Sequence, residues 1–174
     1  METITCDVGI TYVADSAISD SFDVSELDQM KSKIQTNSTR ELLETWITLY
    51  HEKNIPLRKD FTLNLVKKYI KDLAFGECEL DTGRFIVLNH GEGITSLHNQ
   101  NFLRTYIDEM PHSQDVKDFW TRNFRRCVKG HPYLEHFRVD IKGRWKVAAE
   151  SIVLPIKSGK SDDIDMFVTT FVEF

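Results

Sequence analysis

Residues 133–174 constrain the fold most strongly, because they contain three consecutive strand-like runs. Turn-forming segments separate these runs at Lys142-Gly143 and at residues 158–162. Two further strand-like runs lie within residues 75–89, on either side of Asp81-Thr82-Gly83, where the glycine can adopt a positive φ angle. Consecutive runs joined by such short turns favour antiparallel pairing. The sequence therefore predicts an antiparallel sheet of five strands.

A helix is expected over residues 39–54, before the first of these strands. Ser38 and Glu41 have the spacing of a capping box, and Pro56 follows the segment. The helix is amphipathic, with an apolar stripe formed by Leu42, Leu43, Trp46, Ile47 and Tyr50. A second helical stripe runs over residues 61–73.

More helices are expected between the second and third strands. Residues 94–108 indicate short irregular helices, and a longer helix follows Ser113 and ends before Gly130. The outer side of the longer helix is basic and carries Arg122, Arg125, Arg126 and Lys129. Two interpretations stay open for this side: a solvated face, or a docking site for an acidic partner or for the acidic N-terminus of the chain itself.

Residues 1–37 differ in composition from the rest of the chain. They hold seven acidic and two basic residues, whereas residues 38–174 are balanced, so this segment accounts for the net charge of −5. It is poor in large apolar side chains, although residues 24–34 have near-helical apolar spacing. We expect an acidic N-terminal extension outside the main core, partly ordered or disordered, followed by one domain over residues 38–174. The acidic balance argues against general nucleic-acid binding.

The chain has the composition expected of a cytoplasmic protein. It contains no apolar run of about 20 residues, as a membrane helix requires, and no signal-peptide pattern at its start. Its three cysteines, Cys6, Cys78 and Cys127, are odd in number and widely spaced. They are expected to be reduced thiols, with no metal site.

Several motifs together resemble a known family. They are Leu43-x-x-Trp46-x-x-Leu49-Tyr50, Ile55-Pro56-x-Arg58-x-Asp60-Phe61, Arg84-Phe85 with Gly91, Tyr106-Ile107-Asp108-Glu109, and Glu150-Ser151-Ile152-Val153-Leu154-Pro155-Ile156. Their order over residues 38–174 resembles the single-domain PAS family of alphaproteobacteria, also catalogued as PAS type 5 or as a conserved domain of unknown function. The resemblance implies an α+β fold with helices on one face of the five-stranded antiparallel sheet, preceded by the amphipathic helix.

The resemblance also implies a bacterial sensory or regulatory domain that acts through contacts with a signalling partner. A small-molecule cavity between helices and sheet is part of this expectation, with no ligand identified. We expect its lining to come from Phe85, Phe102, Tyr106, Trp120, Phe124, Phe137 and Trp145, with Glu150 as a polar anchor. The alternative for Glu150 is an ion pair with Arg138 or Arg144 on a neighbouring strand.

Amphipathic N-terminal helices of PAS domains often pack against a second copy. A homodimer contact is therefore a hypothesis for Leu42, Trp46 and Tyr50, with Trp46 as its anchor. The basic residues Arg122, Arg125 and Arg126 are the second candidate interface.

Cofactor and enzyme functions have weaker support. Gln100 stands where a light-sensing PAS domain has its reactive cysteine, so no covalent flavin adduct is expected. Haem is not expected either, because His112, His131 and His136 lie outside the inner stripe of the long helix. No catalytic residues are predicted. The alternatives left open are a ligand-free structural adaptor and a small α+β enzyme using Glu150 with His136 or Arg138.

Overall fold

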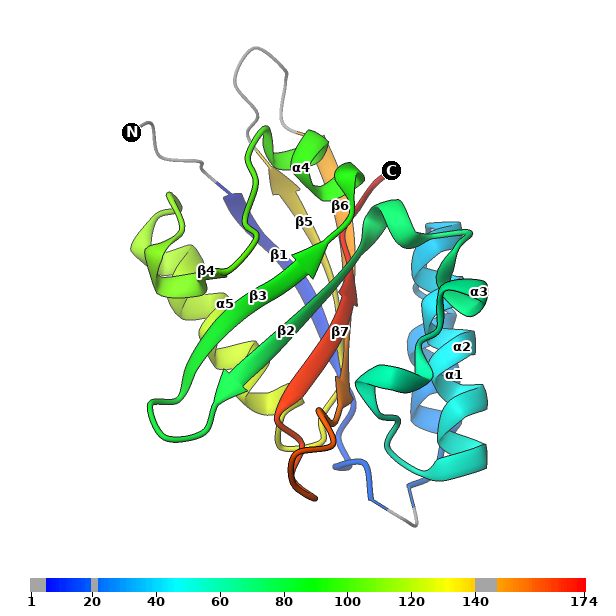
Figure 1. Cartoon of the computed structure of the whole chain (residues 1–174). Coiled ribbons are helices and arrows are strands. Elements are labelled where there is room, and N and C mark those ends of the chain that lie inside the picture. The colour runs from blue at the N-terminus through cyan, green and yellow to red at the C-terminus, as the bar shows by residue number, and fades with distance from the viewer. Residues whose placement is uncertain (1–5, 20–21, 140–146) are drawn as a thin grey trace.

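The computed structural model of the protein describes residues 6–19, 22–139 and 147–174. It has an α+β architecture in which helices pack on a single antiparallel sheet (Figure 1). The antiparallel α+β organisation predicted from the turn-separated runs is thus confirmed.

The sheet has eight strands in the described residues, rather than the expected five. They are β1 (Cys6–Val13), β2 (Leu73–Glu79), β3 (Arg84–His90), β4 (Thr105–Tyr106), β5 (Tyr133–Val139), β6 (Val147–Ile156), β7 (Met166–Thr170) and β8 (Val172–Glu173). Their order is β1-β5-β6-β7-β2-β3-β4, and β8 pairs with β6. The five expected strands correspond to β2, β3, β5, β6 and β7. The additional strands are β1 at one edge and the two-residue strands β4 and β8, which are too short to give an alternating pattern.

The hairpin between β2 and β3 forms at the predicted turn. Glu79 pairs with Arg84 in the register, and the Gly83 amide donates to the Glu79 carbonyl at 2.7 Å. Gly83 has a φ of 67°, a conformation that residues with a Cβ rarely adopt. The glycine in the turn signal is therefore required by the backbone.

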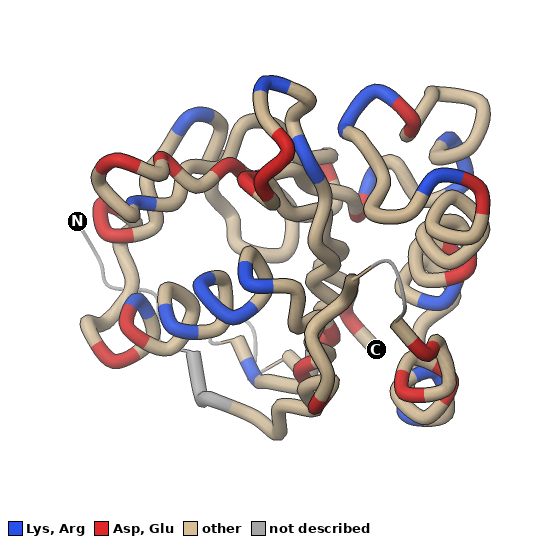
Figure 2. The backbone as a smooth tube through the Cα atoms, turned by 90° about the horizontal axis from the view of Figure 1, so that it is seen from below, with Lys and Arg blue, Asp and Glu red and all other residues tan. Residues whose placement is uncertain are grey.

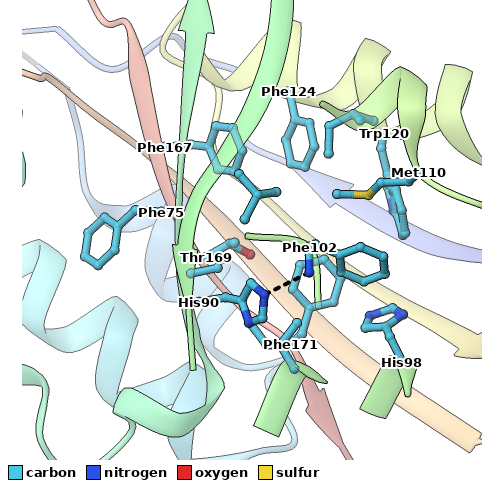
Figure 3. A pocket seen from close by; sticks show the side chains of 14 residues that line it. Phe75, His90, His98, Phe102, Met110, Trp120, Phe124, Phe167, Thr169 and Phe171 are labelled. Atoms are coloured by element: carbon cyan, nitrogen blue, oxygen red, sulfur yellow. Dashed lines mark hydrogen bonds between the residues drawn. The ribbon is translucent and has the colours of Figure 1, made fainter. Parts of the chain in front are cut away.

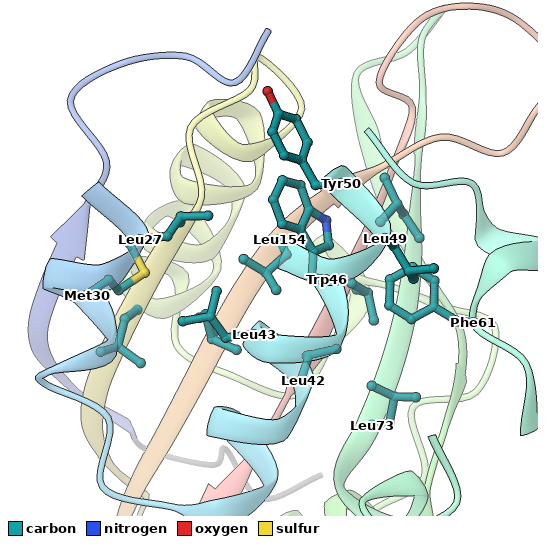
Figure 4. Close-up of a cluster of buried hydrophobic side chains, with 14 of the residues drawn as sticks. Leu27, Met30, Leu42, Leu43, Trp46, Leu49, Tyr50, Phe61, Leu73 and Leu154 are labelled. Carbon is teal, nitrogen blue, oxygen red and sulfur yellow. The ribbon is translucent and has the colours of Figure 1, made fainter. Parts of the chain in front are cut away.

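One face of the sheet is covered by α1 (Ser25–Lys31) and α2 (Asn37–Lys53), with the short α3 (Leu63–Val66) beside them (Figures 1 and 4). The apolar stripe of α2 packs on β6 residues such as Leu154, and Trp46 is fully buried there. Helix α2 starts slightly earlier than predicted, because Thr36 is the N-cap and its side-chain oxygen accepts from the Thr39 amide.

The opposite face is covered by α4 (Glu92–His98), the 3-10 turn η3 (Ile107–Glu109) and α5 (Gln114–Cys127). Helices therefore cover both faces, whereas the sequence prediction placed them on one. The reason is visible in the central strand β6. Its Leu154 belongs to the core under α2 and its Val153 to the core under α5, so both faces of the strand need a covering layer.

The N-terminal segment also differs from its prediction as an extension outside the core. Strand β1 pairs with β5, and the main cluster of buried apolar residues includes Ala14, Ile18, Leu27, Met30 and Ile34. Residues 24–34 contain the expected helix as α1. The buried apolar side chains of the segment belong to the same cluster as the stripe of α2 and residues of the sheet, a spacing that the acidic composition of the segment conceals.

Within the described residues, no helix has both the length and the apolar character needed to cross a membrane. Cys78 and Cys127 are buried free thiols, and burial raises the pKa of both.

Candidate functional site

A cavity lies between the sheet and the helical layer of α4, η3 and α5 (Figure 3). It is lined by Ala74, Phe75, Val87, His90, Ile94, His98, Phe102, Ile107, Met110, Trp120, Phe124, Phe167, Thr169 and Phe171. Its volume is about 40 Å³. A single water needs roughly 10–15 Å³ of such space, so the cavity has room for only a few non-hydrogen atoms.

Aromatic packing builds the wall under α5. Phe124 stacks on Phe167 of β7 with ring centroids 4.3 Å apart and planes 11° apart. Gly76 on the adjacent strand β2 permits this arrangement, because a Cβ there would lie 2.1 Å from the Phe167 ring. The pairing of the large Phe167 with Gly76 on the neighbouring strand therefore determines where this aromatic wall lies.

His98, at the end of α4, is a buried polar residue among those that line the cavity. Its side chain is 4% exposed and contacts Phe102 and Phe171, with ring centroids 5.2 and 5.7 Å away. Nδ1 of His98 has no hydrogen-bond partner. Burial, with smaller contributions from His112 and His90, lowers the pKa of His98 to about 3, so the ring is neutral at pH 7.

His90 is the second histidine of the lining, and both of its ring nitrogens are engaged. Nδ1 lies 3.0 Å from the Gly91 carbonyl oxygen, and Nε2 accepts from the Phe102 amide at 3.0 Å (Figure 3). Nε2 also lies 3.0 Å from Asn101 Oδ1. His90 therefore ties the end of β3 to the segment that carries Phe102.

An exposed cluster holds η3 against the β2–β3 hairpin. The Arg84 guanidinium donates to both carboxylate oxygens of Asp108, at 3.0 and 2.9 Å, and to Glu109 at 2.7 Å. It also lies 3.7 Å from the centroid of the Tyr106 ring, whose hydroxyl donates to Glu79. The hydrogen bonds from Arg84 lower the pKa of Asp108. This cluster positions the η3 wall of the cavity.

Five of the eight predicted pocket residues lie in the cavity lining or pack against it. Phe102, Trp120 and Phe124 line the cavity. Phe85 instead packs behind the lining, with its ring centroid 5.6 Å from that of Phe124, and Phe137 packs on Phe171 at 5.8 Å.

The remaining predicted residues lie elsewhere. Tyr106 belongs to the Arg84 cluster, and Trp145 and Arg144 fall outside the described residues.

Glu150 lies on the opposite face of the sheet and does not line the cavity. Its carboxylate accepts from the Gln35 amide at 2.7 Å, from the Thr36 amide at 3.0 Å and from the Thr36 hydroxyl at 2.7 Å. His136 Nε2 lies 2.8 Å from the same carboxylate, whereas Arg138 is exposed. Glu150 therefore anchors the start of α2 to the sheet, and the sequence-based expectation of a cavity anchor is wrong. The alternative ion pair with Arg144 lies outside the described residues.

The predicted dimer contact through α2 is also not available. Leu42, Trp46 and Tyr50 are all buried within the chain, and the Trp46 indole is 0% exposed. Their stripe contacts the sheet of the same chain, so it cannot anchor a second copy.

The basic side of α5 is exposed at Arg122, Arg125, Arg126 and Lys129. Figure 2 shows positively charged positions along this helix, which lies across the sheet from α1 and α2. Helix α1, which carries Glu26 and Asp28, packs on the other face. These acidic residues therefore do not cover the basic side of α5.

His98 and Phe171 line the cavity but are not among the predicted pocket residues. His98 stands four residues after the buried Ile94, so helical spacing places both on one face of α4. That spacing was the available signal. Phe171 follows the end of β7, where strand alternation gives no reliable direction.

Glu135 was not singled out by the sequence, yet it is a fully buried acid under α5. Its side chain is 1% exposed, and neither carboxyl oxygen has a hydrogen-bond partner of ordinary length and angle. Burial raises its pKa to about 8, and the indole of Trp120 partly offsets this shift. The carboxyl group is therefore largely protonated at pH 7.

No protein-family model matches this chain, and no curated protein shows significant similarity to it.

Proposed function

We propose that this protein is a PAS-like sensory or regulatory domain that acts through contacts with another protein and responds to a small molecule between its helices and sheet. The cavity of about 40 Å³ is the observation that carries the proposal. It lies in the layer formed by α4, η3 and α5, which connect the β2–β3 hairpin to the β5–β7 meander. A hairpin, inserted helices and a three-stranded meander are the plan expected from the family resemblance.

The motifs that carry the family resemblance support the proposal, because their residues contact one another or the lining of the cavity. Arg84 contacts the Tyr106 to Glu109 motif, and Trp46 donates to the carbonyl oxygen of Pro155. Arg58 lies 3.6 Å from the centroid of the Phe75 ring, which lines the cavity. The motif residues thus hold η3 beside the cavity, pack α2 on the sheet, and contact Phe75 of the cavity lining.

The output surface in this proposal is the exposed basic side of α5. Trp120 and Phe124 on the inner side of the same helix line the cavity. A change of cavity occupancy would therefore act on the helix that presents Arg122 and Arg125 to a partner. An acidic surface on a cytoplasmic signalling protein has the charge complementary to this side.

A ligand-free structural adaptor is the second candidate, and the small volume of the cavity favours it. The enzyme alternative has one supporting contact, the 2.8 Å approach of His136 to Glu150. However, Glu150 is 0% exposed and already accepts hydrogen bonds from the backbone of residues 35 and 36. It has no exposed surface for a substrate.

Native mass spectrometry and an absorption spectrum of the freshly purified full chain test the proposal. A reproducible additional mass that disappears in Ala74→Leu, a substitution that fills the cavity, would support a sensor. Ala17→Leu, at an exposed position, is the matched control and should keep the additional mass. A bare mass for the wild type, together with no response of its thermal stability to small-molecule probes, would favour the adaptor.

A further inference from the structure

We infer that a groove between α3 and the sheet binds a small amphipathic carboxylate, with Arg58 as its countercharge and an apolar floor for its hydrocarbon chain. The groove is distinct from the cavity of the proposed function, although Phe75 and His90 border both. The inference goes beyond that function and does not depend on it.

The groove is larger than the cavity. It has a volume of about 280 Å³, against about 40 Å³ for the cavity. Small-molecule sites typically measure roughly 300–1,000 Å³, so the groove is close to the lower end of that range. It suits a molecule with a short hydrocarbon chain.

Most of the groove surface belongs to apolar residues. Its buried lining residues include Phe61, Val66, Leu73 and Phe75, of which Phe61 and Leu73 appear in Figure 4. Leu63 of α3 and Ile70 also line the groove, and their side chains are exposed. A hydrocarbon chain bound here would remove apolar surface of both residues from water, which favours binding.

Arg58 is held in place by its backbone. It begins the 3-10 turn η1 (Arg58–Asp60), and its amide donates to the Lys157 carbonyl at 2.8 Å. The Lys157 amide in turn donates to the Pro56 carbonyl at 3.0 Å. The segment that carries Arg58 is thus attached to the chain just after β6.

The Arg58 guanidinium stacks on a residue of the groove and has its donors available. Its Cζ lies 3.6 Å from the centroid of the Phe75 ring. Stacking uses the face of the guanidinium, whereas its N–H groups point outward in the plane. The guanidinium makes no hydrogen bond or ion pair with any residue that the structure describes, and burial lowers the pKa of Arg58. An arginine nevertheless stays charged at pH 7, so an anion in the groove would gain a partly desolvated countercharge.

The acid nearest in sequence does not supply that countercharge. Asp60 lies in the same turn, but its carboxylate accepts from Lys53 at 2.8 Å and from the Leu57 amide at 2.9 Å. These two contacts occupy both carboxylate oxygens. Arg58 is therefore left for a ligand.

Asn89 is a second polar group of the groove. It pairs with Phe75 in the register of β2 and β3, so the two side chains lie on the same face of the sheet. Because the guanidinium stacks on Phe75, the Asn89 amide is placed at the end of the groove that holds Arg58. Its NH₂ group can donate to an oxygen of a carboxylate.

The lining favours a carboxylate over other head groups. Among the lining residues that the structure describes, Arg58 is the only arginine, lysine, aspartate or glutamate. One carboxylate balances this single charge, and its two oxygens match the fork of the guanidinium. A phosphate dianion would keep an unbalanced charge beside apolar walls, and an ammonium group would meet a like charge.

Binding to the full chain can be followed by NMR, using hexanoate, hexanamide and hexyl phosphate as probes. We expect hexanoate to shift the methyl signals of Leu63, Ile70 and Leu73 and to leave those of Ile94 and Met110, which line the cavity, unchanged. Its affinity should exceed that of hexanamide, which has the same chain without the charge, by about fivefold or more. Hexyl phosphate should bind more weakly than hexanoate.

Arg58→Gln removes the countercharge. It should weaken hexanoate binding about fivefold to tenfold and change hexanamide binding by less than about twofold. Lys59→Gln removes the same charge at the adjacent exposed position, which does not line the groove. This matched control should bind hexanoate as the wild type does.

A pair of substitutions at Leu63 tests the charge preference without altering the stacking of Arg58. The Leu63 side chain is exposed, so both Leu63→Glu and Leu63→Lys should fold. Leu63→Glu should bind hexanoate about threefold more weakly than Leu63→Lys. Leu80→Glu and Leu80→Lys, exposed in the turn between β2 and β3, are the control pair and should bind it equally.

The outcomes separate the groove from the cavity. Shifts confined to Ile94 and Met110 would place hexanoate in the cavity, which would overturn the groove site and support the proposed function. No binding of hexanoate would overturn the inference and leave the proposed function to its own test by mass spectrometry. Wild-type affinity for hexanamide or hexyl phosphate equal to or above that for hexanoate would overturn the carboxylate class.

The variants decide the role of Arg58. Equal hexanoate affinities of a folded Arg58→Gln and Lys59→Gln would overturn that role. If Arg58→Gln does not fold, equal affinities of Leu63→Glu and Leu63→Lys would overturn the charge preference in its place.

Discussion

The Trp46 indole nitrogen donates a hydrogen bond to the carbonyl oxygen of Pro155 at 2.8 Å, inside the layer between α2 and the sheet. Residues far apart in sequence meet here, and the contact joins two of the motifs that characterise the chain. The same indole stacks on Tyr50, with ring centroids 5.1 Å apart. Trp46 is therefore part of the internal core rather than of a surface that binds another molecule.

Trp46→Phe should lower the free energy of unfolding by about 2–4 kcal/mol, because it leaves a buried carbonyl without its donor and opens space in the core. Urea unfolding measures this loss. Leu63→Ala, at an exposed position, is the control and should change stability by less than about 0.5 kcal/mol. The mass measured by analytical ultracentrifugation should be the same for wild type and Trp46→Phe. A change of oligomeric state with unaltered monomer stability would contradict the internal role.

Glu150→Gln should destabilise the start of α2. The carboxylate accepts from two backbone amides and one hydroxyl, whereas a glutamine side chain would turn its NH₂ group toward one of these donors. We expect a loss of about 2–4 kcal/mol in urea unfolding, with faster hydrogen exchange in the first turn of α2. Glu52→Gln, exposed near the end of the same helix, should have little effect. If the amides of the first turn of α2 exchange in Glu150→Gln at the wild-type rate, the anchoring role is refuted.

Arg84→Gln should have a local rather than a global effect. The bonds of Arg84 to Asp108 and Glu109 are exposed, and exposed ion pairs contribute at most about 1 kcal/mol to stability. Their loss should nevertheless release η3, so the Met110 amide, which donates to Ile107, should exchange faster with solvent. Arg125→Gln on α5 is the control. Unchanged exchange at Met110 would show that other contacts hold η3.

Local sequence signals predicted the elements of this fold better than their contacts. Gly83 identified its hairpin because a positive φ angle is a local requirement. Glu150 could not be assigned, since its partners Gln35 and Thr36 lie more than a hundred positions earlier and approach it only when α2 packs. Residues such as Leu27 were missed because average composition does not report the spacing of a few apolar side chains.

The candidate site shows the same division. Helical spacing placed Trp120 and Phe124 on the inner side of α5, and both line the cavity. Strand alternation also predicted that Phe137 lines the cavity. Alternation does not show, however, that Phe171 packs on the Phe137 ring and lines the cavity in its place.

Glu135 should give the stability of the protein a distinct pH dependence. Burial raises its folded-state pKa from 4.5 to about 8, so between these values the unfolded chain releases a proton that the folded chain retains. The stabilising contribution is full below pH 4.5 and is lost as pH rises toward 8. Each pKa unit corresponds to about 1.36 kcal/mol, so the total reaches several kcal/mol. Relative to Glu135→Gln, the wild type should lose stability across this window in urea unfolding, while Glu52→Gln should follow the wild type. Parallel profiles for wild type and Glu135→Gln would show that the carboxyl is ionised in the folded protein.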